Sequence, residues 1–409
     1  MNVLVINCGS SSLKYELYDM TTETSLANGL CERLGNSGSN IEHERADGTV
    51  YEAEVAMPDH RVAIAQAIAA LTSPAHGVIS SLEEISAVGH RVVHGGEEFA
   101  QSVVIDQRVE AAIERFCELA PLHNPPNLLG VRAARELLPD VPHVAVFDTA
   151  FHQTMPPHAY LYGLPHRMYV DHGIRRYGFH GTSHRYVSLR ASQYMAERGV
   201  PVEEQKIVTC HLGNGCSMTA VKAGRSVDTT MGYTPLEGLL MGTRCGDLDP
   251  AIVIYLVQNL RMAPEDVDRL LNKESGLLGL SGVSNDMRDL QKAAAEGNQR
   301  ARIAVDLFAY RVRKYIGAYA AALGGLNCVV FTGGIGENDY LQRRWCVQGL
   351  EFLGIAEDPN KNLPKPELRF TDGIADIGAD DAPGFLLVIQ TDEELMIARD
   401  TMEVLGAQF

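Results

Sequence analysis

The chain opens with a buried strand, a small polar turn and a second strand, and this order excludes the commonest nucleotide-binding units. Residues 3–6 form a short, continuously apolar run, which predicts a buried strand. Residues 7–12 read Asn-Cys-Gly-Ser-Ser-Ser, a turn-forming sequence, and residues 13–18 alternate with period two, which predicts another strand. A P-loop or dinucleotide-binding unit needs a helix directly after the turn, so neither is expected here.

The same order returns in the second half of the 409-residue chain, where two apolar stretches flank the turn His211–Gly215. When Gly9 is laid on Gly213, Asn7 falls on His211. Later in each half, the stretch 144–148 resembles the stretch 328–332. We infer two duplicated β-rich halves whose glycine turns face each other; the alternative is a chance similarity of short apolar strands.

Helices alternate with the strands along the whole chain, which indicates an α/β fold. Asp249-Pro250 predicts a helix start, and a long helix over 301–323 should end at the glycines that follow it. The sequence 391–394, Thr-Asp-Glu-Glu, predicts a capping box for a last helix that reaches about residue 405. The irregular stretches 37–48 and 359–366 are expected to be surface loops.

Composition excludes several classes of protein. Lys and Arg total 35 and Asp and Glu total 52, so the net charge is −17 and no nucleic-acid partner is expected. A hydrophobic fraction of 45% argues against disorder. The eight cysteines form no Cys-x-x-Cys pair, and neither a targeting segment nor a membrane span is predicted, so we expect a cytoplasmic protein with free thiols.

The glycine turns are candidate phosphate sites, because such turns aim several backbone N–H groups at one point. Lys14 lies just past the first turn and can add a point charge. A third glycine turn at 333–338 follows an apolar strand, where a base and ribose could approach the backbone closely. Each turn alone also fits a plain hairpin.

Several charged residues lie where a ligand could reach them. Arg91 lies inside an apolar strand, so it is either a structural ion pair or an anion ligand. Arg244 and His180 both lie in glycine-flanked loops, although an isolated histidine there could be a plain turn residue. Asp148 follows a strand, where α/β proteins place functional carboxylates.

Metal ligands are sparser. His90, His94 and His184 have no third partner at a known zinc spacing, so zinc is not favoured. If the capping box at 391–394 uses Glu394, then Glu393 is left to reach a magnesium-bound water; which of the two faces the metal stays open.

Taken together, the motifs resemble those of the acetate kinase family. The opening from Val3 to Lys14 resembles its N-terminal signature, and His211–Gly215 resembles its second signature. Four further stretches fit in the same order, namely 178–184, 241–247, 286–288 and 334–338. The resemblance runs from Asn2 to Arg399 and implies an actin-like (ribonuclease H-like) fold, shared with sugar kinases and chaperone ATPases. Two related domains would then enclose a nucleotide cleft between them.

The resemblance also implies catalytic and metal-binding roles. Asp148 would be the catalytic carboxylate, and His180 and Arg244 would stabilise the phosphoryl group in transfer. Asn7 and Glu393 would position Mg²⁺, for which Mn²⁺ could substitute.

For the substrates, the resemblance implies that Arg91, also a catalytic candidate, holds the carboxylate of acetate. The methyl group would contact Val93, Leu122, Phe179 and Pro235. ATP or ADP would bind through Ser10, Ser12, Lys14, His211, Leu212, Gly213, Asn214, Gly215, Asp286, Met287, Arg288, Gly334, Ile335, Gly336, Glu337 and Asn338.

The expected reaction is reversible, direct in-line transfer of the γ-phosphoryl group of ATP to acetate, giving acetyl phosphate and ADP. A propionate kinase is the close alternative, since one methylene in an apolar pocket is worth only about 1–3 kcal/mol. An actin-like ATPase without metabolic activity and a sugar kinase are more distant alternatives. The expected domains are 1–150, completed by a C-terminal helix over 392–409, and 151–391. The resemblance further suggests a homodimer, and no membrane partner is expected.

Overall fold

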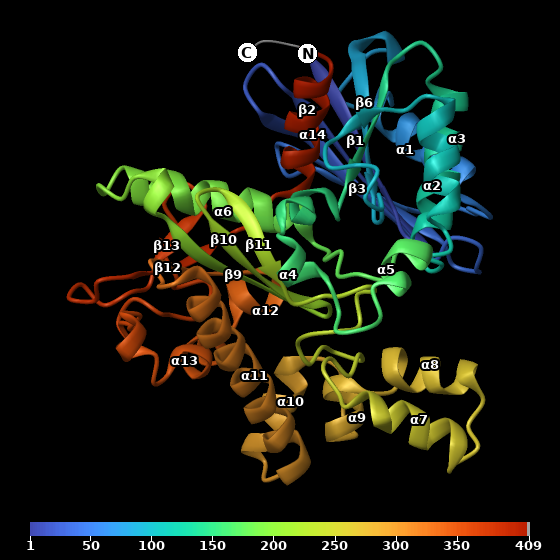
Figure 1. The fold of residues 1–409 in the computed structure, drawn as a ribbon. Coiled ribbons are helices and arrows are strands. Elements are labelled where there is room, and N and C mark those ends of the chain that lie inside the picture. Colours follow the sequence, from blue (N-terminus) through green and yellow to red (C-terminus); the bar gives the residue numbers. More distant parts are fainter. Residues whose placement is uncertain (407–409) are drawn as a thin grey trace. The chain divides into compact units, whose positions relative to one another are not determined.

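In the computed structural model, which describes residues 1–406, the chain divides into two units, each built on one β-sheet (Figure 1). Unit 1 comprises Met1–Phe151 and the chain from Asp392 onward, and unit 2 comprises His152–Thr391. Among the described residues, no helix is both long and apolar enough to cross a bilayer.

The sheet of unit 1 has eight strands in the order β5-β4-β3-β2-β1-β6-β8-β7. β1 pairs antiparallel with β2 and parallel with β6, which pairs parallel with β8. The strands are β1 (Asn2–Cys8), β2 (Ser12–Asp19), β3 (Thr24–Glu32), β4 (Asn40–Arg45), β5 (Val50–Glu54), β6 (Ile85–Val92), β7 (Val103–Val104) and β8 (His143–Phe147).

The sheet of unit 2 has six strands in the order β11-β10-β9-β12-β14-β13. β9 pairs antiparallel with β10 and parallel with β12, which pairs parallel with β14. The strands are β9 (Lys206–Leu212), β10 (Cys216–Lys222), β11 (Arg225–Thr229), β12 (Cys328–Thr332), β13 (Ile374–Asp376) and β14 (Phe385–Ile389).

The two sheets repeat one pattern of five strands, which confirms the duplication inferred from the sequence. In each, a three-stranded antiparallel meander is followed by two parallel strands. The pairing of 144–148 with 328–332 is wrong, however, because β12 holds the place of β6, and β14 holds the place of β8. Short apolar runs look alike in sequence, and only strand order distinguishes them.

The helices of unit 1 include one from the far end of the chain. They are α1 (His60–Leu71), α2 (Gln107–Arg115), α3 (Asn124–Leu137) and α14 (Glu393–Val404). Figure 1 shows α14, drawn in red, beside the blue strands of the N-terminal sheet. This contact depends on Gly89 in β6, where a Cβ atom would lie 2.5 Å from Oγ1 of Thr401 and 2.8 Å from Cγ2 of Ile397.

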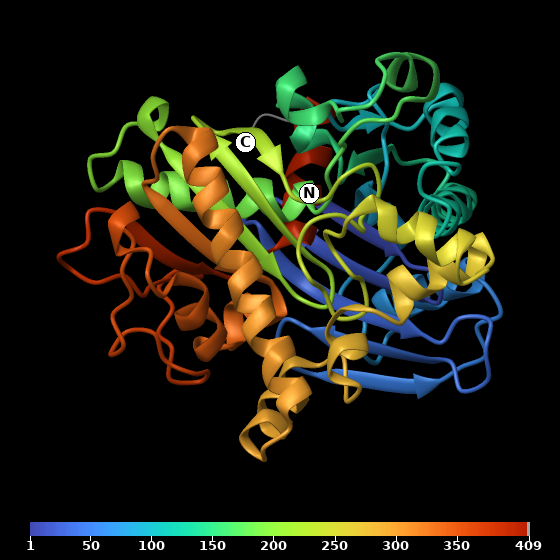
Figure 2. The same cartoon turned by 60° about the horizontal axis from the view of Figure 1, so that its bottom comes forward.

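In unit 2, every residue of β12 is buried, as in a strand covered on both faces. Helices α6 and α11 pack on this sheet, and Figure 2 shows the long α11 lying along it. The helices are α4 (Pro157–Tyr160), α5 (Arg167–His172), α6 (Gly181–Ala196), α7 (Pro250–Gln258), α8 (Pro264–Lys273), α9 (Gly276–Ser281), α10 (Met287–Ala295), α11 (Gln299–Leu323), α12 (Gly333–Asn338) and α13 (Tyr340–Val347).

Four local predictions need correction. The expected loop at 37–48 contains β4, which pairs with β3 and β5. The glycine turn at 333–338 is the helix α12, entered through Gly333 at φ +76°. The last helix is capped by Asp392, which accepts from the backbone N–H of Leu395, and not by Thr391. That helix ends at Val404, and the predicted extension over 407–409 lies outside the described residues.

Candidate active site

In unit 1, Arg91 and Asp148 lie at one edge of the sheet because the parallel strands β6 and β8 end there. The Arg91 Nε and Nη2 atoms donate to Oδ1 and Oδ2 of Asp148, at 3.1 and 2.6 Å. Nη1 of Arg91 donates to Oδ1 of Asn7, at 3.3 Å. The Asp148 side chain is 1% exposed, whereas that of Arg91 is 22% exposed. The ion-pair interpretation of Arg91 is therefore confirmed, and its accessible part leaves a ligand role open.

The first turn of α14 brings two more carboxylates into unit 1. Glu394 accepts from Nζ of Lys14, at 2.7 Å. Burial lowers the pKa of Lys14, but Glu394, Glu16 and Glu393 outweigh burial and raise that pKa. Lys14 is thus held beside the turn at 9–11, as a charge that a phosphate would have to share with Glu394.

Glu393 lacks such a direct partner among the hydrogen bonds of the described residues. Burial raises the pKa of Glu393 to about 7; Arg91 opposes this shift, and the carboxylates of Asp148 and Glu394 add to it. As predicted, Glu394 is engaged and Glu393 is left without such a partner among the described residues, but the reason differs. Glu394 is occupied by Lys14 and not by a capping box.

The donor set at this edge fits Mg²⁺. The amide oxygen of Asn7 and the Glu393 carboxylate are hard oxygen ligands, and a divalent cation would offset the crowding of negative charge around Glu393. In residues 1–406, no three His, Cys, Asp or Glu side chains form an all-protein metal cage. Mg²⁺ commonly keeps several waters and binds through one or two protein ligands and phosphates, so such a cage is not required.

Two asparagines that the sequence analysis missed brace this edge. Asn127 accepts from the Val93 N–H (3.0 Å) and donates to the Cys8 carbonyl (2.7 Å). Asn124 accepts from the His94 N–H, also at 3.0 Å. Both lie at the start of α3, in the sequence Asn-Pro-Pro-Asn. A pair of asparagines around two prolines was the available signal.

Of the predicted methyl-pocket residues, Val93 is 5% exposed and Leu122 is 56% exposed, both in unit 1. In unit 2, Phe179 is 2% exposed and Pro235 is half-buried. Val93 and Phe179 are thus packed within their own units, whereas the Leu122 side chain is exposed.

In unit 2, His180 and Arg244 lie beside the same glycine. A Cβ atom on Gly215 would lie 3.5 Å from Cε1 of His180 and 3.6 Å from Nη1 of Arg244. His180 precedes α6 in a left-handed conformation, with φ 55°, and its Nδ1 lies 2.9 Å from Oγ of Ser217. The two cationic candidates from separate loops therefore meet at the turn between β9 and β10.

Arg244 has no carboxylate partner among residues 1–406. Its Nη1 donates to the Pro235 carbonyl at 3.1 Å. Burial lowers the pKa of Arg244, and the main opposing influence is Cys216. A guanidinium that is removed from water and has no counter-charge is prepared to bind an anion.

Histidines and hydroxyls behind His180 form a connected chain. Ser217 also bonds Nε2 of His184 (2.7 Å), whose Nδ1 bonds Thr209 (2.7 Å). The rings of His180 and His211 lie 4.4 Å apart. Burial and the neighbouring histidines hold the pKa of His184 well below its usual range, so His184 stays neutral.

The predicted nucleotide motifs of unit 2 gather around the turn 213–215. The Gly242 N–H donates to the carbonyl of Asn214 (3.0 Å), and the Asn285 side chain donates to Oδ1 of Asn214 (3.1 Å). A Cβ atom on Gly333 would lie 2.9 Å from the Leu212 carbonyl. Four stretches that are distant in sequence therefore share one location.

Other nucleotide candidates have varied surroundings. Ser10 is exposed and Ser12 is half-buried. Asp286 caps α10 and pairs with Arg288, whose side chain is 89% exposed. Met287 is buried at 3% exposure, so its side chain packs inside unit 2.

The rest of the 334–338 segment is tied to its own backbone. The Glu337 carboxylate accepts from the N–H groups of Gly333 (3.0 Å) and Thr391 (3.2 Å). Asn338 donates to the Gly334 carbonyl, at 2.8 Å. Both side chains brace the segment in this structure.

Comparisons with known proteins agree on one family. The model of the family described as the acetokinase family matches residues 2–399. An acetate kinase of Clostridium botulinum is 54% identical over 404 residues, covering 99% of each chain. An acetate kinase of Methanosarcina acetivorans is 55% identical, covering 99% of this chain and 97% of the relative.

Solved structures give the same result. The crystal structure of Porphyromonas gingivalis acetate kinase is similar with a TM-score of 0.92 and 47% identity, covering 99% of both chains. A propionate kinase from Francisella tularensis is similar with a TM-score of 0.89 and 39% identity, covering 98% of this chain and 99% of that one.

Proposed function

We propose that this chain, which belongs to the acetokinase family, transfers the γ-phosphoryl group of ATP reversibly to acetate, giving acetyl phosphate and ADP. The arrangement of His180 and Arg244 beside Gly215 is the observation that carries the proposal. During transfer, negative charge spreads over the three equatorial oxygens of the phosphoryl group. Cations that are fixed in advance stabilise this charge without reorganising.

On the acceptor side, Arg91 would hold the carboxylate of acetate. Carboxyl groups of this kind have pKa values of about 4, so acetate is already a nucleophile at neutral pH and needs no general base. The two hydrogen bonds from Arg91 to Asp148 support a different role for Asp148. It orients the guanidinium and balances its charge.

Mg²⁺ would neutralise charge on the phosphates when bound. Asn7 and Glu393 would hold it. Mn²⁺, which also prefers oxygen ligands, could substitute. For the nucleotide, the backbone N–H groups of the two glycine turns and the charge of Lys14 would contact phosphates, and the residues 286–288 and 334–338 would surround adenosine.

The test is to trap the product. Purified protein is incubated with ATP, Mg²⁺, acetate and hydroxylamine, and acetyl hydroxamate is measured. We expect hydroxamate to depend on ATP, Mg²⁺ and acetate, and ADP to form in equal amount. ATP hydrolysis without hydroxamate would contradict the proposal and favour an ATPase without metabolic activity, and turnover on glucose or glycerol would favour a sugar kinase.

Acceptor length needs a separate measurement. One extra methylene is worth about 1–3 kcal/mol in an apolar pocket, so propionate and butyrate should react more slowly than acetate. Comparing kcat/KM for the three acids checks this expectation. A clear preference for propionate would make the protein a propionate kinase, a function found for a structural relative.

We also propose a cytoplasmic homodimer. The eight cysteines are free thiols, which suits a reducing compartment. Helix α7 exposes Ile252, Ile254 and Tyr255 at 46–54%, which supports a partner surface. Sedimentation measures the mass, and a monomer at assay concentration would contradict the dimer. Cell fractionation tests the compartment.

A further inference from the structure

The segment that carries Pro235 and Arg244 is a long loop between β11 and α7, here called the 230–247 loop. Two hydrogen bonds between Gly238 and Asp247 close its base. The Gly238 N–H donates to the side-chain Oδ1 of Asp247, and the Asp247 N–H donates to the Gly238 carbonyl, both at 3.0 Å. The Tyr315 hydroxyl on α11 donates to Oδ2 of Asp247, at 2.6 Å. One side of the loop is therefore fastened to a long helix.

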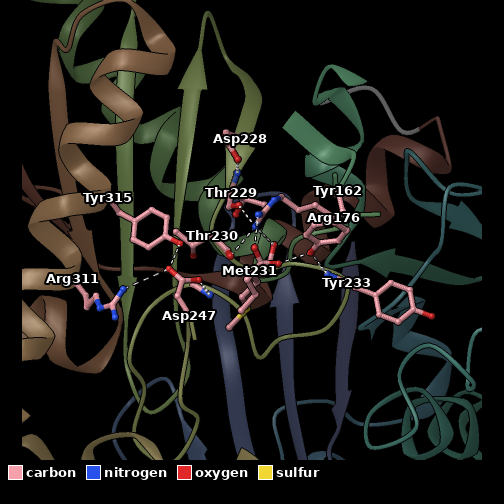
Figure 3. Close-up of polar contacts among 12 residues, drawn as sticks. Tyr162, Arg176, Asp228, Thr229, Thr230, Met231, Tyr233, Asp247, Arg311 and Tyr315 are labelled. Carbon is pink, nitrogen blue, oxygen red and sulfur yellow. Dashed lines mark hydrogen bonds and ion pairs between the residues drawn. The ribbon is translucent and has the colours of Figure 1, made fainter. Parts of the chain in front are cut away.

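The other side is fastened by Arg176 (Figure 3). Nη1 of Arg176 donates to the carbonyls of Thr229, Thr230 and Met231, at 2.9, 2.8 and 3.2 Å. Its Nη2 donates to Oε1 of Glu237, at 2.6 Å. One guanidinium thus spans the end of β11 at Thr229 and the side chain of Glu237 further along the loop.

Glu237 is held from its second oxygen as well. The Tyr162 hydroxyl donates to Oε2 of Glu237 and accepts from the Tyr233 N–H, at 3.0 Å. A Cβ atom on Gly232 would collide with Oε2 of Glu237, so the backbone passes directly beside this carboxylate. Tyr162, Arg176 and Glu237 therefore fix the part of the loop that contains Pro235.

Arg176 also belongs to the segment that leads to His180. The next two residues, Tyr177 and Gly178, both donate their N–H groups to the carbonyl of Gly232, at 3.0 and 3.3 Å. The position of His180 and that of the 230–247 loop are consequently coupled through a few hydrogen bonds around Arg176.

We propose that Arg176 and Glu237 are positioning residues that hold the Pro235 carbonyl, and through it Arg244, in the geometry that phosphoryl transfer requires. Neither residue is assigned to touch a substrate. The inference rests on the proposed function, in which Arg244 is the group that stabilises the phosphoryl charge.

Three substitutions weaken the hydrogen bonds that hold the 230–247 loop, to different degrees. In Arg176→Lys the charge remains, but an ammonium cannot span three carbonyls and a carboxylate. Glu237→Gln keeps an acceptor for Arg176, and Tyr162→Phe removes one hydrogen bond. We expect kcat to fall by about 100-fold in Arg176→Lys, since a misplacement of about 1 Å costs that much, and less in the other two. The dissociation constant of ADP should stay within about twofold.

Matched controls come from unit 2. Arg190→Lys weakens an arginine–carboxylate pair with Asp372, and Tyr194→Phe removes a tyrosine–carboxylate bond to Asp376. Neither contacts the 230–247 loop in the hydrogen bonds of residues 1–406. Both should leave kcat unchanged.

A double-mutant cycle separates positioning from general destabilisation. If Arg176 acts through Arg244, then Arg176→Lys should change kcat by less than roughly threefold in an Arg244→Ala background. A full 100-fold loss in that background would overturn the inference.

Hydrogen exchange on the full chain gives a readout that does not need activity. In Arg176→Lys, amide exchange across residues 231–247 should accelerate by about tenfold or more, with no change in Arg190→Lys. Unchanged exchange in this segment overturns the inference, whether or not the enzyme is active. Absence of acetyl hydroxamate from the unaltered protein would instead overturn the proposed function, so the two failures are distinguishable.

Discussion

At the scale of single residues, the pairing of Arg91 with Asp148 bears most directly on the acceptor site that is proposed. Asp148 is almost fully buried, and both of its oxygens accept from Arg91. A carboxylate whose two oxygens both accept from one guanidinium holds that guanidinium in a fixed orientation. This geometry supports the orienting role that is proposed for Asp148.

Replacing Asp148 by Asn tests that role. We expect Asp148→Asn to lower kcat by about 100-fold or more, because Arg91 loses its bidentate charged partner. The shape of the kcat–pH profile between pH 6 and 8 should stay the same, since no proton transfer is removed. Steady-state kinetics measure both quantities. Retention of most of kcat would remove Asp148 from catalysis altogether.

Buried histidines in unit 1 make the stability of the protein depend on pH. Nε2 of His90 lies 2.9 Å from Nδ1 of His143, and burial holds the pKa of His90 well below its usual range. His90 therefore binds no proton in the folded protein near pH 6, whereas the unfolded chain does, below about pH 6.5. Stability from this group is complete above that pH and is lost as pH falls.

The prediction concerns His90→Gln. The variant lacks the titrating group. The difference in unfolding free energy between the unaltered protein and the variant should therefore be about 1 kcal/mol smaller at pH 5.5 than at pH 7.5. Urea unfolding at the two pH values measures this difference. A difference that stays constant with pH would contradict the assignment of a neutral buried histidine.

At the scale of elements, the contact of α14 with β6 depends on the absence of a side chain at Gly89. Strand and helix are separated by about three hundred residues in sequence, so no local pattern announces the contact. Adding a methyl group here pushes against Thr401 and Ile397, and overpacking of this kind costs about 1–3 kcal/mol.

We therefore expect Gly89→Ala to lower the unfolding free energy by that amount. Gly317→Ala in α11 is the matched control. A Cβ atom at Gly317 meets no atom within 4 Å, and alanine favours a helix over glycine by about 0.5–1 kcal/mol, so this variant should be slightly more stable. Denaturant unfolding of both variants measures whether the free energy of unfolding falls in Gly89→Ala and rises in Gly317→Ala. Equal effects would contradict close packing at Gly89.

Elements were predictable where the chemistry is local. The start of α7 at Asp249-Pro250 and the end of α11 at Gly324 follow from capping, and both are confirmed. The cap of α14 was not predictable from the sequence, because Thr391 and Asp392 are adjacent and both can cap a helix. Thr391 is used by Ser183 at 2.9 Å, while Asp392 accepts from Leu395 at 2.8 Å. Tertiary partners made that choice.

In the candidate site, too, some residues were predictable from the sequence and others were not. Arg91, His180 and Arg244 stand out in sequence because a charged side chain inside an apolar or glycine-rich segment needs a reason. The partners that hold them do not stand out. Glu237 is 61 residues from Arg176, and Asn127 is 119 residues from Cys8, and nothing in either neighbourhood indicates these pairs.

At the scale of the whole molecule, the duplication explains why similar turns carry different chemistry. In unit 1 the first turn lies near Asn7, Lys14 and acidic groups, whereas in unit 2 the equivalent turn lies near His180, His211 and Arg244. The same strand–turn–strand unit thus carries an asparagine, a lysine and carboxylates in one half, and histidines and an arginine in the other.

The central claim is that the phosphoryl group passes directly from ATP to acetate, stabilised by fixed cations, with no phosphorylated side chain between them. The stereochemical course at phosphorus tests this claim most directly. With ATP made chiral at the γ-phosphorus by oxygen isotopes, a single in-line displacement inverts the configuration in acetyl phosphate. We predict inversion; retention would require a phosphorylated enzyme and would contradict the account.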